Sequence, residues 1–263
     1  MIKKKTLKKR KIISLILIII FLGIFIFSGI KIINYLNDNK KNKDIQEITK
    51  ESITINNNEN IKLEEKYIVN FKLLKDQNPD TVAYLKVPGT NIDYIVVKGK
   101  DNSFYLNHNF KKDYNVSGWI FADYHNKFDG NDKNIVIYGH NTMDGSMFGT
   151  LKNTSQSEWQ NNLENHKIIL ITENGFSLYQ VFSTYTIEPE DYYINTIFSN
   201  DNQYINFLNK IKSRSNNNYN LEVNKDDHIL TLSSCTANGT KRVVLHAKRL
   251  DNEIDDKYII ENN

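Results

Sequence analysis

The chain has 263 residues, a formal net charge of +3 at pH 7 and a single cysteine. Seven of its first eleven residues are Lys or Arg, and without them 27 basic residues stand against 31 acidic ones. The remainder of the chain is therefore mildly acidic, which argues against nucleic acid as a partner. One cysteine cannot form an internal disulfide, so a fold stapled by disulfides is excluded.

An apolar run follows the basic start. Residues 12–30 contain no charged side chain, and Lys31 ends the run. A helix of nineteen residues covers about 29 Å, which is close to the hydrocarbon thickness of a bilayer. Ile, Leu and Phe fill the run and no small-residue cleavage site follows it, so we expect an uncleaved transmembrane anchor. The positive-inside rule predicts a single pass through the cell membrane, with residues 1–11 as a cytoplasmic tail and the C-terminal bulk extracellular.

A polar segment separates this anchor from the rest of the chain. Residues 31–60 are rich in Lys, Asn, Asp and Glu and are predicted to form a stalk. Apolar residues recur at nearly helical spacing from Ile61 to Leu74, which predicts an N-terminal helix that ends before Asn78-Pro79-Asp80. We expect one domain over residues 61–250 and a C-terminal tail over residues 251–263.

Short strands broken by turn residues follow from Thr81 onward. Glu173-Asn174-Gly175 is a strong hairpin signal, and residues 201–213 show the spacing of an amphipathic helix with Asp201 at its cap. Closely spaced strands over about 200 residues predict a single closed β-barrel or a sandwich. The expected strands are Val82–Val87, Ile92–Val97, Gly118–Ala122, Asn134–His140, Lys167–Thr172, Phe176–Thr186, His228–Ser234 and Arg242–Leu250.

The only cysteine, Cys235, lies at the end of one predicted strand, and Arg242 opens the next. A guanidinium held beside a thiol favours the thiolate, lowers the thiol pKa from its free value of about 8.5 and creates a nucleophile. The alternative is that Cys235 is a small buried hydrophobic residue, which cysteine often is.

A thiol nucleophile needs a partner for proton transfer and a group that stabilises an oxyanion. His140 ends the most hydrophobic strand, after Tyr138 and Gly139, where a catalytic group can be held rigidly. His246 shares a strand face with Arg242 and either enters the site or lines the barrel. The other four histidines lie in polar contexts typical of the surface. Motifs for metal binding and glycine-rich phosphate loops are missing from the sequence, so we expect no metal and no cofactor.

Several stretches together resemble the class B sortases, which are cysteine transpeptidases of Gram-positive bacteria. The resemblance spans residues 61–250 and includes the order His140, Cys235, Arg242 behind an N-terminal anchor. The stretches that carry it are Asn134-Ile-Val-Ile-Tyr-Gly-His-Asn141, Thr231-Leu-Ser-Ser-Cys-Thr236, Asn78–Tyr94, Asp101–Leu106 and Gly118–Tyr124.

The resemblance implies a mainly β protein: a closed eight-stranded sortase-type barrel with an N-terminal helix and a helix before the penultimate strand. It implies that Cys235 attacks a backbone carbonyl in the C-terminal sorting signal of a secreted protein and forms a thioacyl-enzyme. An amine of a peptidoglycan precursor or a pilin then accepts the acyl group. His140 would transfer protons, and Arg242 would hold the substrate and stabilise the oxyanion.

Three further residues are candidates for substrate binding. Ser234 stands where the family often has Thr, which keeps a hydroxyl for substrate contact. Asn91 and Asn141 are candidates for lining the substrate groove, with a plain turn role as the alternative. Ile95 replaces a common proline and Tyr84 replaces a common tryptophan, which puts substrate preference and local packing in question. Two other functions stay open: a membrane-tethered cysteine peptidase, and a non-catalytic surface barrel that binds peptide or cell wall.

Overall fold

The computed structural model describes residues 2–56, 58, 61–235 and 239–250, with side chains for all of these except residues 2–11 and 235. The predicted C-terminal tail, residues 251–263, lies outside the described residues. The chain forms two compact units, residues 1–41 and 42–263. The second unit contains the predicted domain.

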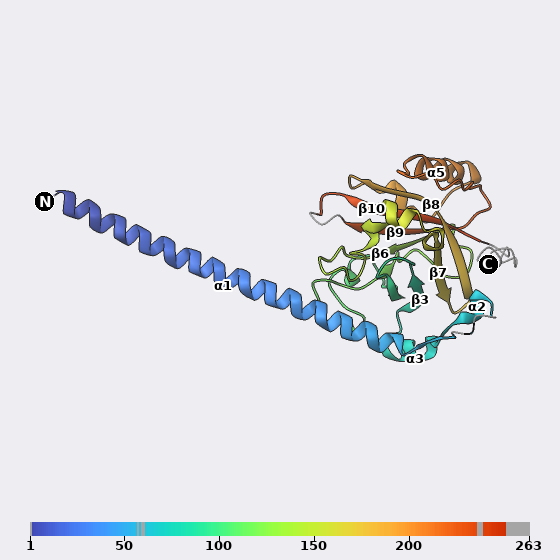
Figure 1. Ribbon diagram of the computed structural model, residues 1–263, viewed down its shortest axis with the longest axis horizontal. Coiled ribbons are helices and arrows are strands. Elements are labelled where there is room, and N and C mark those ends of the chain that lie inside the picture. Colours follow the sequence, from blue (N-terminus) through green and yellow to red (C-terminus); the bar gives the residue numbers. More distant parts are fainter. Residues whose placement is uncertain (1, 57, 59–60, 236–238, 251–263) are drawn as a thin grey trace. The chain divides into compact units, whose positions relative to one another are not determined.

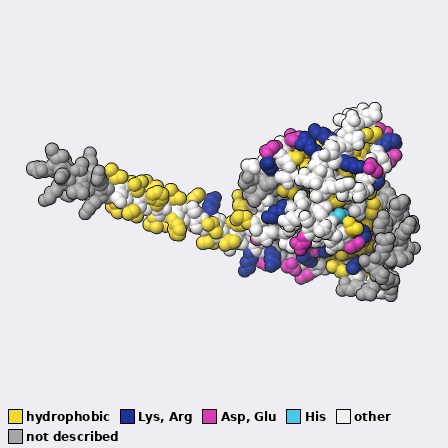
Figure 2. Space-filling model, turned by 45° about the horizontal axis from the view of Figure 1, so that its top comes forward, with side chains coloured by type: hydrophobic (Ala, Val, Ile, Leu, Met, Phe, Trp, Pro, Cys, Tyr) yellow, Lys and Arg dark blue, Asp and Glu magenta, His cyan; other side chains and the backbone are white. Residues whose placement is uncertain are grey.

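The first unit is a single continuous helix, the N-terminal part of α1 (Ile2–Lys50). Large apolar side chains cover its described surface from Ile12 to Leu36 (Figure 2). The helix is long and apolar enough to cross a membrane, as the run of uncharged residues predicts.

The last turns of α1 belong to the second unit and pack on the barrel. The Asn42 side chain exchanges two hydrogen bonds with that of Asn115, at 3.1 and 2.9 Å, and donates to the Gly118 carbonyl at 3.0 Å. Ile45 is buried, and Gln46 Nε2 donates to the Asp93 carbonyl at 2.8 Å. Residues 42–50, which were expected in the polar stalk, are therefore fixed to the folded unit.

The region between α1 and the barrel differs from the single helix expected over Ile61–Leu74. It holds a two-stranded antiparallel sheet, β1 (Ile53–Ile55) with β2 (Tyr67–Val69), and two short helices, α2 (Leu63–Lys66) and α3 (Phe71–Gln77). The Asn70 side chain accepts from the Leu73 amide at 3.0 Å and starts α3 as its N-cap. A capping asparagine inside an apolar period divides it into separate elements.

Eight strands close into one barrel in the order β10-β8-β7-β3-β4-β5-β6-β9, which confirms the predicted fold class (Figure 1). The pairs β4–β5 and β6–β9 are parallel and the others are antiparallel. The strands are β3 (Thr81–Lys86), β4 (Asp93–Val97), β5 (Phe121–Ala122), β6 (Asn134–Tyr138), β7 (Lys167–Thr172), β8 (Gly175–Ile187), β9 (Ile229–Cys235) and β10 (Arg242–Arg249).

Short helices fill the connections. The α-helices are α4 (Ser157–Gln160) and α5 (Asp201–Ser213), and the 3₁₀ helices are η1 (Phe104–Leu106), η2 (Leu151–Ser155), η3 (Leu163–His166) and η4 (Tyr192–Ile194). The β7–β8 hairpin turns at Glu173-Asn174, as predicted, and Gly175 follows with φ +125°, a conformation that L side chains rarely adopt. Helix α5 has the predicted bounds, but Asn200 rather than Asp201 caps it by accepting from the Gln203 amide.

Two apolar layers hold the unit together. One fills the barrel, where Leu230, Leu232 and Val243 are buried. The other lies between the outer face of the barrel and α5, with Ile229 and Val244 on the strand side. Figure 1 shows α5 over this part of the sheet. Alternate residues of β9 and β10 therefore face the barrel interior and the α5 side.

Candidate active site

A cavity of about 290 Å³ opens where the ends of β6, β9 and β10 meet the η1 and η4 segments. His140, Ser234 and Arg242 all line it, so three of the predicted site residues come together although the sequence separates them widely. Asn102, Leu106, Phe121 and residues of the segment Pro189–Ile194 also line the cavity.

Strand register places Cys235 directly opposite Arg242. The antiparallel β9–β10 pair aligns Cys235 with Arg242, Ser234 with Val243 and Ser233 with Val244. Arg242 begins β10, and its guanidinium reaches the carbonyls of Gly239 and Lys241 at 3.4 and 3.3 Å. The side chain of Cys235 lies outside the described residues. The backbone alone therefore places the thiol residue and the guanidinium residue at the same level of the sheet.

Gly139 allows His140 to approach the barrel closely. A Cβ atom at Gly139 would lie 2.5 Å from Ile120 Cδ1 and 2.7 Å from Phe148 Cγ, which is too close for any other residue without rearrangement. The His140 carbonyl accepts from the Phe148 amide at 2.9 Å. The backbone that carries the imidazole is therefore held against a packed surface.

The His140 imidazole is oriented by a carbonyl. Its Nε2 lies 2.7 Å from the Leu106 carbonyl oxygen. A carbonyl oxygen only accepts, so Nε2 carries the hydrogen, and in the neutral ring Nδ1 is left with the lone pair. The Leu106 carbonyl thus selects the tautomer and leaves Nδ1 for proton exchange.

Tyr138, Tyr193 and Ser233 also line the cavity, and their hydroxyl groups are hydrogen-bonded. Tyr193 and Ser233 share a hydrogen bond of 3.0 Å between their hydroxyl groups, and Tyr138 donates to Asp123 Oδ2 at 2.8 Å. Burial, with the Asp123 charge adding to it, raises the pKa of Tyr138. The Tyr138 hydroxyl therefore keeps its proton and stays a donor.

Asn91 and Asn141 do not line this cavity. The Asn91 amide donates to Thr150 Oγ1 at 3.0 Å and its side chain reaches the Gly145 carbonyl at 3.4 Å. Asn141 forms an isolated bridge with Met147. Both residues make contacts within loops, which agrees with the turn role given above as the alternative.

His246 occupies the buried layer beneath α5. It is fully buried, with Nε2 2.8 Å from the Tyr185 hydroxyl and Nδ1 2.8 Å from Thr231 Oγ1. Burial lowers its pKa to about 3, so the ring is neutral. Of the two roles left open for His246, the structure favours the structural one.

Sequence reasoning missed the walls of the cavity. Asn102, Tyr138 and the acidic pair Glu190–Asp191 line it, yet none was singled out as a site residue. Asn102 and Tyr138 lie within the stretches that carry the family resemblance, and Tyr138 also shares a predicted strand face with His140. The segment from residue 189 to 194 follows a strand end with no regular pattern, so only the fold brings it to the site.

Known proteins match the chain closely. A sortase domain model matches residues 85–250. Sortase B of Listeria monocytogenes is 36% identical over 226 residues, which cover 83% of this chain and 88% of the relative. Sortase B of Clostridium perfringens superposes with a TM-score of 0.65 at 39% identity, over 69% of this chain and all of that structure (100%). A Staphylococcus aureus sortase B–substrate complex superposes with a TM-score of 0.65 at 29% identity, over 86% of this chain and 98% of that one.

The family model covers more than half of the chain, and the curated relatives and solved structures are sortase B proteins. The chain therefore belongs to the sortase family, and it is a class B member, a cysteine transpeptidase.

Proposed function

We propose that this protein cleaves the C-terminal sorting signal of a secreted protein through a thioacyl intermediate on Cys235 and transfers the acyl group to an amine. The main support for this proposal is the direct pairing of Cys235 with Arg242 in the β9–β10 register, beside a cavity lined by His140 and Arg242. Positions opposite each other in an antiparallel pair share a face of the sheet.

The first half-reaction forms the thioester. The thiolate of Cys235 attacks the carbonyl carbon of the scissile peptide bond and produces a tetrahedral oxyanion. Arg242 stabilises that negative charge. Protonated His140 gives a proton from Nδ1 to the leaving nitrogen, the C–N bond breaks, and the C-terminal fragment departs as an amine. Nε2 keeps its hydrogen bond to the Leu106 carbonyl throughout.

The second half-reaction releases the product. An incoming amine attacks the thioester carbonyl, Nδ1 of neutral His140 takes its proton, and the C–S bond breaks to regenerate the thiolate. The acceptor is an amine of a peptidoglycan precursor or of a pilin. The match to a sortase B–substrate complex supports the assignment of a sorting signal as the peptide substrate.

Membrane attachment completes the proposal. The apolar stretch of α1 anchors the protein with residues 1–11 in the cytoplasm and the catalytic unit outside. Secreted substrates and cell-wall amines are both found on that side. The helix's length and apolar surface support this arrangement.

Product analysis tests the proposal and separates it from peptide hydrolysis and simple binding. The full chain in detergent is given fluorogenic peptides with Asn-Pro-x-Thr-Asn-like and Pro-x-Thr-Gly-like signals, with and without hydroxylamine as a strong amine acceptor. We expect cleavage that requires Cys235 and a hydroxamate product when hydroxylamine is present. Hydrolysis alone at saturating hydroxylamine would indicate a peptidase. Binding without any product in the wild type would indicate a non-catalytic barrel.

A further inference from the structure

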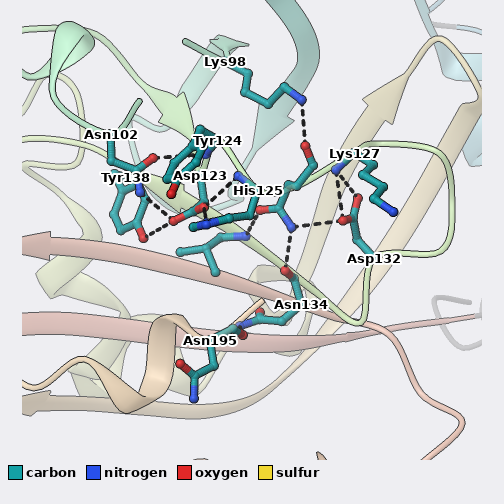
Figure 3. Close-up of polar contacts among 12 residues, drawn as sticks. Lys98, Asn102, Asp123, Tyr124, His125, Lys127, Asp132, Asn134, Tyr138 and Asn195 are labelled. Carbon is teal, nitrogen blue, oxygen red and sulfur yellow. Dashed lines mark hydrogen bonds and ion pairs between the residues drawn. The ribbon is translucent and has the colours of Figure 1, made fainter. Parts of the chain in front are cut away.

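A buried carboxylate lies behind the cavity, with no part in the reaction described above. Asp123 directly follows β5 and is only 3% exposed. Its Oδ2 accepts from Tyr138 Oη at 2.8 Å and from Asn102 Nδ2 at 2.7 Å. Its Oδ1 accepts from the His125 amide at 3.0 Å and from His125 Nδ1 at 2.8 Å. Figure 3 shows these donors converging on the carboxylate.

One arm of this network leads to His140 along β6. Tyr138 is the last residue of β6, and only Gly139 separates it from His140. Its phenol stays protonated and donates to Asp123, so the ring is pinned where it lines the cavity. The strand end that presents the imidazole is therefore fixed by the carboxylate.

The other arm leads to His140 through the loop that carries Leu106. The Asn102 side chain donates to Asp123 and accepts from the Tyr124 amide at 3.0 Å, so both ends of its amide are fixed. η1 follows and ends at Leu106. The carbonyl of that residue accepts from His140 Nε2 at 2.7 Å. Asp123 thus holds both the segment that carries the imidazole and the segment that orients it.

We propose that Asp123 is a positioning residue for His140: its carboxylate clamps Tyr138 and Asn102 together and so maintains the hydrogen bond from Nε2 to the Leu106 carbonyl. Asp123 acts through these neighbours without touching substrate. The expected effect of Asp123 on turnover rests on the proposed proton transfer by His140. Its expected effect on the orientation of the His140 ring does not, and can be measured separately.

Asp132 offers a matched control in the adjoining loop. Its carboxylate accepts from the Lys127 amide at 3.0 Å (Figure 3). It also accepts from the Phe128 amide at 2.7 Å and from Asn126 Nδ2 at 3.2 Å. These three donors are not among the residues that line the cavity. Asp132→Asn removes a similar set of hydrogen bonds and leaves those of Tyr138, Asn102 and Leu106 in place. Its link to β6 runs through Asn126, which bonds to the backbone of Asn134 and Val136.

Asp123→Asn places an NH₂ group where one carboxylate oxygen accepts. Near Asn102 and Tyr138 that NH₂ would face the Asn102 amide donor, and in the other orientation it would face the His125 backbone amide. At least one donor is left without an acceptor in either case, which disfavours the clamped arrangement. Tyr138→Phe is a milder second variant, since it removes one arm and leaves the carboxylate intact.

¹⁵N NMR spectra of the full chain, labelled with ¹⁵N-histidine and kept in detergent, show which nitrogen of each imidazole ring carries the hydrogen. His140→Ala identifies the His140 signals. We expect the wild type and Asp132→Asn to show the Nε2–H tautomer, and Asp123→Asn to show a mixture with Nδ1–H. Tyr138→Phe should show a partial change toward the Nδ1–H tautomer. If circular dichroism shows that Asp123→Asn does not fold, the spectrum of Tyr138→Phe tests the proposal in its place. An unchanged tautomer in the folded variant, or an equal change in Asp132→Asn, would overturn the proposal.

Turnover of the fluorogenic peptides gives the second readout. We expect Asp123→Asn to lower kcat about tenfold, equivalent to about 1.4 kcal/mol of activation free energy, with KM changed by less than about threefold. Asp132→Asn should match the wild type. A fall in affinity alone would contradict a positioning role. Full activity in His140→Ala would instead refute the proposed proton transfer. The tautomer measurement on the other variants would still test the positioning role of Asp123.

Discussion

Arg242 brings a planar, permanently charged group to the cavity, and this geometry distinguishes it from lysine. The fork of N–H donors can hold an oxyanion while also contacting backbone carbonyls, as the contacts to Gly239 and Lys241 illustrate. An ammonium group has the same charge but lacks the fork. The proposed role of Arg242 therefore depends on shape as well as on charge.

We predict that Arg242→Lys lowers kcat by about 10²-fold, the scale expected for loss of an oxyanion donor, while the fold is retained. Steady-state cleavage of the fluorogenic peptides by the full chain measures this. Arg249→Lys at the other end of β10 is the matched control. Equal activity of Arg242→Lys and wild type would show that charge alone suffices.

His246 links stability to pH through its burial. The unfolded ring has a pKa near 6.5, and burial lowers the folded pKa to about 3. Below pH 6.5 the unfolded state binds a proton that the folded state does not, so stability falls as the pH falls from 6.5 toward 3. We predict a loss of roughly 2 kcal/mol from this residue between pH 7.5 and pH 5.

Urea unfolding of the full chain at the two pH values measures this loss, with His246→Gln as the comparison. The variant is expected to be less stable overall but less sensitive to pH. Equal pH dependence in wild type and His246→Gln would contradict the burial of a neutral ring.

At the scale of elements, Asn134 connects the barrel to the wall of the cavity. It is fully buried on β6, where its Oδ1 accepts from the Thr231 hydroxyl at 2.7 Å. Its Nδ2 donates to the carbonyl of Asn195, which Figure 3 labels beside it, at 2.8 Å. Asn195 directly follows η4, whose residues line the cavity. One amide therefore fixes the η4 segment to the strand that leads to His140.

Asn134→Ala is predicted to cost about 2 kcal/mol of unfolding free energy, because two buried partners lose their hydrogen bond. It should also raise KM for the peptide, since the η4 wall loses its anchor. Asn165→Ala is the control, because the Asn165 side chain bonds to the Trp159 carbonyl away from the cavity. A similar rise in KM for both variants would show a general loss of stability rather than a loosened wall.

Local patterns predicted the elements that depend on local chemistry. The β7–β8 hairpin follows from Asn174-Gly175, and α5 follows from its apolar period. The docking of residues 42–50 was not predictable, because Asn42 bonds to Asn115, which lies 73 residues away in the sequence. An amide pair of this kind has no sequence period. Its partners become neighbours only when the barrel closes.

The site was predictable to the extent that strand ends carry it. His140, Cys235 and Arg242 end or begin strong strand patterns, and of the predicted residues His140, Ser234 and Arg242 line the cavity. Asn102, Asp123 and the η4 wall lie in irregular loops whose positions depend on hydrogen bonds across the fold. Asparagine is abundant in the chain, so the sequence could not show which asparagines line the cavity. Asn91 and Asn141 were chosen as candidates, whereas Asn102 was not.

At the scale of the whole molecule, chemical labelling of the single cysteine can show on which side of the membrane it lies. If the apolar stretch of α1 is an anchor with the basic end inside, Cys235 lies outside the cell. We predict that a membrane-impermeant maleimide labels Cys235 in intact cells as completely as in permeabilised ones, read by mass shift of the purified chain. Cys235→Ala gives the background. Labelling only after permeabilisation would reverse the orientation.

In the proposed mechanism, Cys235 carries the acyl group between two substrates. Intact-mass spectrometry of the full chain, mixed with an intact sorting peptide that it cleaves and quenched in acid, detects such an intermediate. We expect an adduct with the mass of the N-terminal acyl fragment, absent from Cys235→Ala and lost when hydroxylamine is added as the hydroxamate appears. Peptide cleavage with no adduct at any time, or an adduct that persists in Cys235→Ala, would contradict the thioacyl mechanism.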